Sequence, residues 1–550
     1  MVERSDLQCS DGMDSSRPRS EGTGADRSTA NDTTRSGRTR RTVLGGIAAA
    51  GAAAIGVTST VGASTSTDLY EEYYDDYENV VNVVEAGADN TGTESITPVL
   101  EDLRADDTLF VFPEGRYFMD EQFRYTGFEN IGFVGSDATL VPADYHAFDG
   151  PQFRLFRLGV TYNPGSRLRF EGFDVDQTAP DTGIRAIEAY VSDRLEVRDI
   201  TVRGQHDSGT WGPGLFNVTD PDGTGIVERF RAPDGGAWVE NTPNAGNRWR
   251  GPIGIEANQN AGTLEFKHCW LGGFPNNGLY AAGGDGRIVV SGGLYRNSNG
   301  ANVRVGGTDS EIRWPTVEVD ETRPEDRTQR GIRIENSQNI EIYGALVDIT
   351  SPMPTSHAIS VMNTCEKARI KNTEVQIRGS NVNHGIVLSP DCGETTIADT
   401  SISHETAGGY PLWIRDSDRS ERILAEHLTI SGRSGDASGF RDGIRCERDN
   451  CRFSHISVTQ VGRDGTDRNA IVNTGADLTV YRSDLRASQY PYLDVGTDAL
   501  VRDSDLESTD EAAVCLYASA ENPTFKKNRL AGGIRDLGAS GVTTWKNTIE

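Results

Sequence analysis

The chain is poor in lysine, in large apolar side chains and in positive charge. Six of its 550 residues are lysine, 36% are hydrophobic, and 54 basic against 82 acidic residues give a formal net charge of -28. A chain of this sign repels phosphate backbones, which argues against nucleic-acid binding through a basic surface. No run of 18 or more apolar residues occurs outside the leader, so we expect no membrane-spanning helix.

Cysteines are also few, and none has metal-finger spacing. Six follow the leader, at Cys269, Cys365, Cys392, Cys446, Cys451 and Cys515. The spacing predicts no zinc site, and an even number permits disulfides outside the cell without requiring them. We expect no cofactor, and calcium stays open without a calcium-loop motif to support it. The acidic, lysine-poor composition itself is typical of halophilic proteins, because high salt screens self-repulsion while carboxylates keep the surface hydrated.

The first 66 residues have the composition of a lead-in and a signal. Residues 1–38 are rich in Ser, Thr, Asp and Arg, which predicts a disordered lead-in. Residues 39–66 contain Arg40-Arg41 before an Ala/Gly-rich apolar run and resemble a twin-arginine signal peptide, with an ordinary helix as the alternative. We therefore expect a secreted, extracellular protein.

A short strand phrase recurs from residue 250 onward. Its copies are Ile253-Gly-Ile255, Leu279-Tyr-Ala281, Val303-Arg-Val305, Ile332-Arg-Ile334, Ile359-Ser-Val361, Ile386-Val-Leu388, Leu412-Trp-Ile414, Ile444-Arg-Cys446, Ile471 and Leu493-Asp-Val495. They recur every 22–32 residues, and second and third strands follow many of them. Period-2 alternation within such a repeat predicts an all-β, single-stranded, right-handed parallel β-helix over residues 151–550.

Residues 67–150 are expected to form an N-terminal cap and the first coils. Val80–Val84 is strand-like, a helical segment spans Ile96–Leu103, and Phe110-Val-Phe-Pro-Glu-Gly-Arg-Tyr117 follows. This order resembles the opening of the pectate-lyase-like superfamily, with its capping helix and first coil. The resemblance implies a parallel β-helix and, more loosely, a polysaccharide-active or surface-binding role.

The catalytic motifs of that superfamily are incomplete here. His384-Gly385 resembles one element of polygalacturonase-type hydrolases, but no paired aspartates precede it by one coil. Arg369-Ile370-Lys371 comes before His384 and is therefore in the wrong order, and Arg313-Trp314-Pro315 lacks the second arginine of the pectate-lyase motif. Neither mechanism transfers to this chain.

The register predicts which side chains face outward. If the anchor residues of each phrase point inward, the residue between them points outward, as do some neighbours. The expected substrate-binding residues are Tyr280, Arg304, Trp413, Arg415, Arg445 and Asp442. Aromatic rings stack on sugars and guanidinium groups bind carboxylates, so this face is a candidate track for an acidic polysaccharide. The same rule places Asp494 outward.

The candidate catalytic residues are His384, His357, Arg333 and Tyr410. The two histidines stand one coil apart and could include a general base of near-neutral pKa. Arg333 could stabilise the anionic intermediate of a uronate lyase, and Tyr410 could protonate the leaving oxygen. The alternative is that the outward arginines pair with neighbouring carboxylates and the histidines only complete turns.

Two further features concern loops and cysteines. Residues 204–251 are rich in Gly, Pro, Asp and Trp and are expected to be a loop insertion leaning over the face, where a second site could lie. Cys365 and Cys392 both come six residues after an anchor isoleucine, so they should stack as a disulfide or as two thiols.

The leading hypothesis is an extracellular carbohydrate-active protein, a polysaccharide lyase-like enzyme acting on an acidic, uronate-containing polymer. The alternatives are a non-catalytic surface or matrix protein that binds glycans, and a polysaccharide hydrolase. The expected partner is a polysaccharide or surface glycan, with no nucleic acid and no membrane span; the sequence does not decide the oligomeric state.

Overall fold

The computed structural model describes residues 70–148, 153–208, 212–242, 251–350, 353–354, 356–463 and 465–550. All of them belong to one compact unit, Gly46–Glu550. The expected lead-in at 1–38 and the twin-arginine signal at 39–66 lie outside the described residues.

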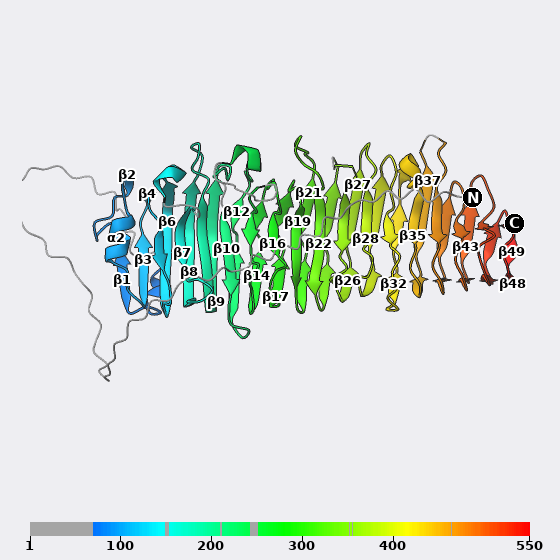
Figure 1. Ribbon diagram of the computed structural model, residues 1–550, viewed down its shortest axis with the longest axis horizontal. Helices are drawn as coiled ribbons and strands as arrows, with labels where there is room; N and C mark the ends of the chain where they lie inside the picture. Colours follow the sequence, from blue (N-terminus) through cyan, green and yellow to red (C-terminus); the bar gives the residue numbers. More distant parts are fainter. Residues whose placement is uncertain are drawn as a thin grey trace, which may run out of the picture. The chain divides into compact units, whose positions relative to one another are not determined.

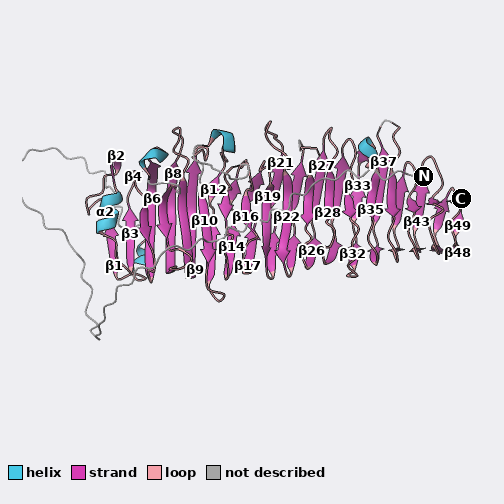
Figure 2. Cartoon of the chain, in the orientation of Figure 1, coloured by secondary structure: helices cyan, strands magenta, loops and turns pink. Residues whose placement is uncertain are grey.

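The described chain is a parallel β-solenoid of about 16 turns, as the repeat predicts (Figure 1). Nearly all of its regular structure is strand (Figure 2). Each typical coil contributes one strand to each of three parallel ladders, which we call the first, second and third sheets. Strands in each ladder pair with their equivalents one coil away, as β22 does with β25 and β23 with β26.

The strands divide among the three sheets as follows. The first sheet contains β5 (Phe123–Tyr125), β7 (Arg154–Leu158), β10 (Gly214–Val218), β13 (Ile255–Glu256), β16 (Leu279–Ala281), β19 (Ala301–Gly307), β22 (Arg330–Ser337), β25 (His357–Val361), β28 (His384–Leu388), β31 (Leu412–Ile414), β35 (Asp442–Cys446), β38 (Asn469–Asn473), β41 (Tyr492–Asp494), β44 (Val514–Leu516) and β47 (Ile534–Asp536). The second sheet contains β1 (Asn79–Asn82), β3 (Thr108–Phe112), β6 (Asn130–Pro142), β8 (Gly165–Asp176), β9 (Arg185–Arg203), β11 (Thr224–Glu228), β14 (Thr263–Lys267), β17 (Arg287–Ser291), β20 (Ser310–Arg313), β23 (Ile340–Tyr343), β26 (Lys367–Lys371), β29 (Glu394–Ala398), β32 (Ile423–Glu426), β36 (Cys451–Ser454), β39 (Thr479–Tyr481), β42 (Leu500–Arg502), β45 (Thr524–Lys526) and β48 (Thr543–Trp545). The third sheet contains β2 (Thr91–Ser95), β4 (Gly115–Met119), β12 (Arg231–Ala232), β15 (Trp270–Leu271), β18 (Leu294–Arg296), β21 (Thr316–Val319), β24 (Leu346–Ile349), β27 (Glu374–Arg378), β30 (Ser401–Glu405), β33 (Thr429–Ser431), β34 (Arg433–Ser434), β37 (Ser457–Gly462), β40 (Asp484–Ala487), β43 (Asp505–Ser508), β46 (Arg529–Ala531) and β49 (Thr548–Ile549). Strands β6, β8 and β9 are long enough to turn a corner and also pair within a neighbouring sheet.

Helices are short. They are α1 (Glu71–Tyr74) and α2 (Thr97–Asp102), with 3-10 turns at Tyr145–Ala147, Val239–Asn241 and Ala437–Gly439. Pro98 lies in the first turn of α2, where its missing N–H costs no hydrogen bond, and Leu100 is fully buried. The short capping helix expected at Ile96–Leu103 is therefore confirmed.

The core is a stack of equivalent inward side chains. Ile332, Ile359 and Ile386 are paired partners on successive coils and have no exposed surface. In the first coils Phe123 and Phe156 take these places, and on the second sheet the Phe110 and Phe133 rings stack with their centroids 5.1 Å apart. Fully burying one such side chain stabilises the fold by roughly 1.5–3 kcal/mol, so a core that repeats can extend with chain length.

The strand register in the structure differs from the register predicted from the sequence at the first and last copies of the repeated strand phrase. Ile255 pairs with Leu279, so the outward residue beside Tyr280 is Glu256 and not Gly254. Further along, Tyr492 pairs with Ile471, which turns Asp494 inward beside Asn473. The prediction that Asp494 faces outward is wrong, because a slip of one residue exchanges the two faces of a strand.

The sequence predicts a loop insertion at 204–251, but most of this segment forms a coil of the solenoid. Strands β10, β11 and β12 pair with β9 on one side and with β13, β14 and β15 on the other. Because its first-sheet strand reads Gly214-Leu-Phe, without the β-branched anchors of later coils, the repeat is hidden in the sequence. Trp211, Trp249 and Arg250 lie outside the described residues.

The corner between the second and third sheets is a single residue with positive φ. Ordinary side chains as well as glycines take this left-handed conformation, including His455 (φ 53), Arg482 (φ 48), Lys527 (φ 57) and Lys546 (φ 53). A non-glycine residue pays a conformational cost there, and its side chain stands out at the corner.

The six cysteines of the described chain are buried free thiols. Cys365 and Cys392 do lie on adjacent coils, where the Gly393 N–H donates to the Cys365 carbonyl at 2.8 Å. Burial raises the pKa of the Cys365 thiol to about 12. The sequence left a disulfide and two thiols open, and the structure has two thiols.

Within the described residues, no helix has the length and apolar character needed to cross a membrane.

Candidate functional site

The outer face of the first sheet carries most of the predicted site residues in register. Tyr280 pairs with Arg304, Arg304 with Arg333, and Arg333 with Ser360. The column continues through Val387 to Trp413 and Arg445. The sequence therefore placed this column correctly, and the structure decides what each side chain contacts.

One carboxylate occupies both Arg304, expected to bind substrate, and Arg333, expected to be catalytic. Arg304 Nε donates to Glu335 Oε1 at 2.6 Å, and Arg333 Nε donates to Glu335 Oε2 at 2.6 Å. The Glu335 side chain is 5% exposed, and the Arg304 guanidinium also lies 4.3 Å from the centre of the Tyr280 ring. Because both guanidinium groups already share a buried anion, they are poorly placed to bind another.

Arg445 is occupied in the same way. Its Nε donates to Glu447 Oε1 at 3.0 Å, and its Nη1 lies 3.6 Å from Asp442 Oδ2. The Trp413 indole N–H donates to the other oxygen of Glu447 at 3.3 Å. Burial raises the pKa of Asp442, which also accepts a hydrogen bond from Asn469. The alternative that outward arginines pair with neighbouring carboxylates is correct for Arg304, Arg333 and Arg445.

The histidines form the centre of an aromatic cluster. His357 and His384 pair across adjacent coils, as the sequence predicted, with ring centroids 5.6 Å apart. The His384 ring lies 5.6 Å from Tyr410, 5.1 Å from Trp413 and 5.2 Å from Phe440, centroid to centroid. Phe440 was not anticipated, because it belongs to the loop beside the Ala437–Gly439 turn and not to the repeat.

Both histidines are neutral at physiological pH. Burial, with a smaller contribution from the charge of Arg415, lowers the pKa of His384 to about 3. Burial lowers the pKa of His357 well below its usual range, and Arg330, His384, Arg415 and Arg333 lower it further. The expectation of a near-neutral pKa is therefore wrong, since solvent exclusion and nearby cations both oppose protonation.

The hydrogen bonds of the two rings differ. His384 is 2% exposed, and its Nδ1 accepts from the Tyr410 backbone N–H at 3.2 Å, which assigns the proton to Nε2. His357 is partly exposed, and its Nδ1 lies 3.0 Å from Ser360 Oγ. Tyr410 is 8% exposed, and burial followed by the charge of Asp442 raises its phenol pKa. Of these three groups, His357 is the one that a ligand reaches most readily.

Arg415 has a different environment from the paired arginines. Its guanidinium carbon lies 5.0 Å from the centre of the Trp413 ring. Among the described residues, no carboxylate lies within 4.0 Å of its nitrogens. Its charge nevertheless reaches both histidines. Arg415 is thus a cation with anion-binding capacity left beside a stacked indole ring.

A buried arginine holds this cluster together. Arg468 Nη1 donates to the carbonyls of Gly435 and Phe440 at 2.9 and 3.0 Å, and Nη2 donates to the carbonyl of Gly409 at 3.1 Å. These bonds fix the segments that present Tyr410 and Phe440. Burial lowers the pKa of Arg468 to about 10, so it stays charged at neutral pH.

A second charged cluster lies earlier on the same face and was missed from the sequence. Glu188 is 3% exposed and accepts from Arg154, Arg157 and Arg185 at 2.5, 3.1 and 2.8 Å. Arg185 also lies 3.5 Å from Glu256. The phrase Ile187-Glu-Ala189 could have revealed it, because it repeats the strand pattern upstream of residue 250. Its charges are mutually paired.

Metal ligands are not clustered in the described part of the chain, where no group of three or more His, Cys, Asp or Glu side chains could hold an ion.

No protein-family model and no curated protein sequence matches the chain. Solved structures with a similar fold include PfbA, a surface adhesin of Streptococcus pneumoniae, at 8% identity and TM-score 0.36, covering 84% of this chain and 93% of the adhesin. A second is the catalytic unit of a GH87 alpha-1,3-glucanase from Streptomyces thermodiastaticus, at 13% identity and TM-score 0.26, covering 85% and 68%. A third is the A-module of the Azotobacter vinelandii mannuronan C-5 epimerase AlgE4, at 8% identity and TM-score 0.23, covering 85% and 97%. Because all three TM-scores are below 0.5, these likenesses support no conclusion about this chain, and the function has to be inferred from the site.

Proposed function

We propose that this protein is an extracellular carbohydrate-active protein that binds an acidic polysaccharide on the outer face of the first sheet, around Arg415, Trp413 and His357. The observation that carries the proposal is Arg415, which lies over Trp413 with no carboxylate partner in the described chain. A guanidinium group binds a carboxylate through two parallel hydrogen bonds, and an indole face packs against a sugar ring. Together they suit a uronate unit.

The neighbouring groups favour an anionic ligand over a neutral one. Arg330 and Arg333 also place positive charge near His357, while the two imidazoles contribute none because they are neutral. Arg333, however, shares Glu335, so among the described residues the charge left without a carboxylate neighbour in this cluster is that of Arg415, in a protein of net charge -28. A carboxylate ligand that binds in this cluster is stabilised by the local positive potential, and its binding displaces no charged histidine.

The test is binding of purified oligouronates, followed by titration calorimetry and tryptophan fluorescence. We expect Arg415→Gln to lower affinity by roughly one to two orders of magnitude, because one charge-assisted contact contributes about 1.5–3 kcal/mol. Trp413→Phe should remove most of the fluorescence change. The matched control is Arg369→Gln on the second sheet, which removes the same charge at a distance and should leave affinity within about twofold. Equal losses in both variants would contradict the proposal.

A second candidate function is β-elimination of a uronate polymer, favoured by the partly exposed, neutral imidazole of His357. In this reaction His357 Nε2 would take the C5 proton, and the electron pair would first be delocalised onto the uronate carboxylate. The C4–C5 double bond would form as the C4–O bond breaks, and the leaving oxygen would take a proton from water. Arg415 would stabilise the charge that develops on the carboxylate.

Binding ranks above elimination because a strongly lowered pKa makes His357 a weak base. Incubation with polyuronates separates the two. Unsaturated products absorbing in the ultraviolet, lost in His357→Gln while oligouronate binding persists, would establish the lyase. Retention of the polymer without product would leave binding as the function.

A further inference from the structure

The outer face of the second sheet forms a separate groove near the last coils. Strands β36, β39, β42 and β45 supply its floor, in which Arg452 pairs with Thr479, Thr479 with Leu500, and Leu500 with Thr524. A parallel column on the same face runs through Tyr481, Arg502, Lys526 and Trp545. Alternation within each strand turns both columns outward, because Val480, Val501 and Phe525 between them are fully buried. We call this the second-sheet groove.

Basic side chains outnumber acidic ones in the lining of the second-sheet groove. It encloses about 460 Å³, and its lining includes Arg422, Arg452, Arg502 and Lys526 but a single carboxylate, Asp477. Within the described residues, no carboxylate lies within 4.0 Å of the side-chain nitrogens of Arg422, Arg452 or Lys526. Arg502 has one such neighbour, Asp503, at 3.6 Å.

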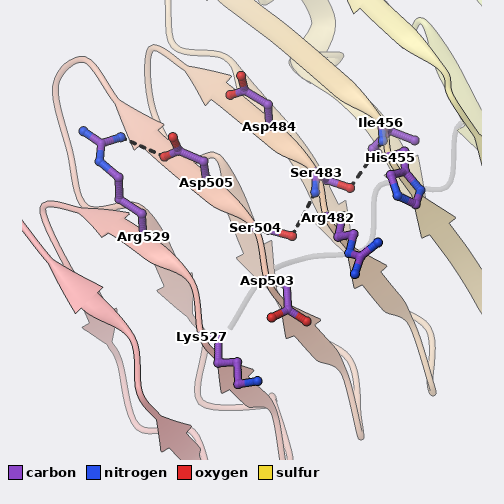
Figure 3. A pocket seen from close by; sticks show the side chains of 10 residues that line it. All are labelled: His455, Ile456, Arg482, Ser483, Asp484, Asp503, Ser504, Asp505, Lys527 and Arg529. Carbon is purple, nitrogen blue, oxygen red and sulfur yellow. Dashed lines mark hydrogen bonds and ion pairs between the residues drawn. The ribbon is translucent and has the colours of Figure 1, made fainter.

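The adjacent hollow shows that this imbalance is local. It lies at the corner toward the third sheet, where Arg529 pairs with Asp505 at 2.7 Å (Figure 3). Asp484 and Asp503 also line it, against Arg482 and Lys527. Acidic and basic side chains therefore alternate there, whereas the second-sheet groove keeps an excess of cations.

Two aromatic rings, a half-buried tyrosine and an exposed tryptophan, accompany the cations. The Arg502 and Arg482 guanidinium carbons lie 4.1 and 4.8 Å from the centre of the Tyr481 ring. The ammonium groups of Lys526, Lys527 and Lys546 lie 4.6, 5.6 and 4.4 Å from the centre of the Trp545 ring, which is 43% exposed. Half of the six lysines in the chain therefore gather around one tryptophan.

We propose that the second-sheet groove binds an anionic polysaccharide independently of the first-sheet site. The cations would bind carboxylate or sulfate groups, the hydroxyls of Thr479 and Thr524 would bond sugar hydroxyls, and Trp545 would stack on a ring beyond them. Because equivalent residues repeat once per coil, the groove presents its contacts as a row, which suits a linear polymer. The inference does not depend on the proposed function, because it concerns a different sheet and shares no residue with it.

The test compares two triple variants of the full chain with the same change of charge. One is Arg452→Gln/Arg502→Gln/Lys526→Gln in the groove. The control is Lys367→Gln/Arg369→Gln/Lys371→Gln, whose two lysines face Glu394 and Glu341 on the same sheet. Binding is measured by affinity electrophoresis in gels that contain a polyuronate, a sulfated polysaccharide or a neutral glucan, at two salt concentrations. Thermal unfolding verifies that both variants are folded.

We expect the groove variant to lose at least roughly 10-fold in affinity for one or both anionic polymers, as three charge-assisted contacts imply, with the control within about twofold. The two anionic gels distinguish a carboxylated from a sulfated ligand. Trp545→Ala should weaken binding further than Trp545→Phe.

Three outcomes would overturn the inference. They are no retardation of the wild-type protein by either anionic polymer, equal losses in the groove and control variants, and equally tight, groove-dependent binding of single-stranded DNA. Arg415→Gln should retain the groove-dependent part of the retardation. A failure of the groove is thereby distinguishable from a failure of the first-sheet site.

Discussion

The outer faces of the first and second sheets carry the same kinds of side chain and use them differently. On the first sheet, Arg304 and Arg333 share Glu335, and Arg445 contacts Glu447 and Asp442. In the second-sheet groove, Arg452 and Lys526 have no carboxylate within 4.0 Å in the described chain. In an acidic protein an outward arginine is therefore a poor marker of an anion site, and the carboxylates around it decide its role.

Paired and unpaired cations also differ in whether they contribute to the stability of the fold or to ligand binding. A buried carboxylate shared by two guanidinium groups fixes the register of adjacent coils, and removing it leaves uncompensated charge. An exposed cation stabilises the fold little and stays available to a ligand. Substitutions of the paired residues on the first sheet should accordingly change the free energy of unfolding, whereas substitutions in the second-sheet groove should change ligand binding.

The largest effect is expected from Arg468→Met, which should disrupt the first-sheet cluster alone. The carbonyls of Gly409, Gly435 and Phe440 would lose a buried donor, so the free energy of unfolding should fall by about 4 kcal/mol or more. Urea unfolding and a shift of Trp413 fluorescence measure this. Arg463→Met, which removes one hydrogen bond at the surface, is the control. Loss of polymer binding in the second-sheet groove would show that the two faces are not separate.

The next largest effect is expected from Glu335→Gln. Arg304 and Arg333 would keep their charges without the shared anion, which should lower the free energy of unfolding by roughly 3 kcal/mol. Asp477→Asn removes the carboxylate of the second-sheet groove and should change it by no more than about 0.5 kcal/mol. Similar shifts of the urea midpoint in both variants would remove the distinction between the faces.

The buried His384 predicts a pH dependence of stability that arises from a residue of the first sheet. The folded-state pKa of His384 is about 3, below the usual 6.5, so the unfolded chain binds the proton more readily. The contribution of this group to stability is complete above pH 6.5 and is lost as pH falls toward 3. Between pH 7 and pH 5 the loss is roughly 2 kcal/mol.

His384→Gln should remove that share of the pH dependence of urea unfolding, whereas Thr396→Ala on the second sheet should not. Burial, followed by the charge of Arg468, also lowers the pKa of His404 to about 3. His404 therefore continues to contribute to the pH dependence of stability in both variants. An unchanged pH dependence in His384→Gln would mean that the ring is solvated in solution.

The smallest effect on stability is expected from Lys526→Gln. The free energy of unfolding should change by no more than about 0.5 kcal/mol, because a partly exposed ammonium group without an ion pair stabilises the fold little. The salt dependence of polysaccharide binding should become shallower, since one fewer counterion is released. Lys367→Gln, which removes an ammonium group paired with Glu394, should leave that salt dependence unchanged.

The repeat was predictable because it is local and periodic. The alternation in Ile332-Arg-Ile334 and its copies fixed three things: the all-β solenoid, the pairing of His357 with His384, and the column from Tyr280 to Arg445. Where the phrase weakened, at Gly214–Phe216 and at Tyr492–Asp494, a coil and a register were missed. A short phrase without β-branched anchors has two registers of similar quality, and only packing chooses between them.

By itself, the sequence determined the solenoid, its period, and which residues repeat along the first sheet. The tertiary structure decided that Glu335 and Glu447 occupy the outward arginines, that solvent exclusion keeps His384 neutral, and that Phe440 joins its cluster. It also decided that Arg452, Arg502 and Lys526 lie in one groove with few carboxylates. Periodicity sets the direction of each side chain, but charge pairing and burial depend on contacts between coils that are about 27 residues apart in the chain.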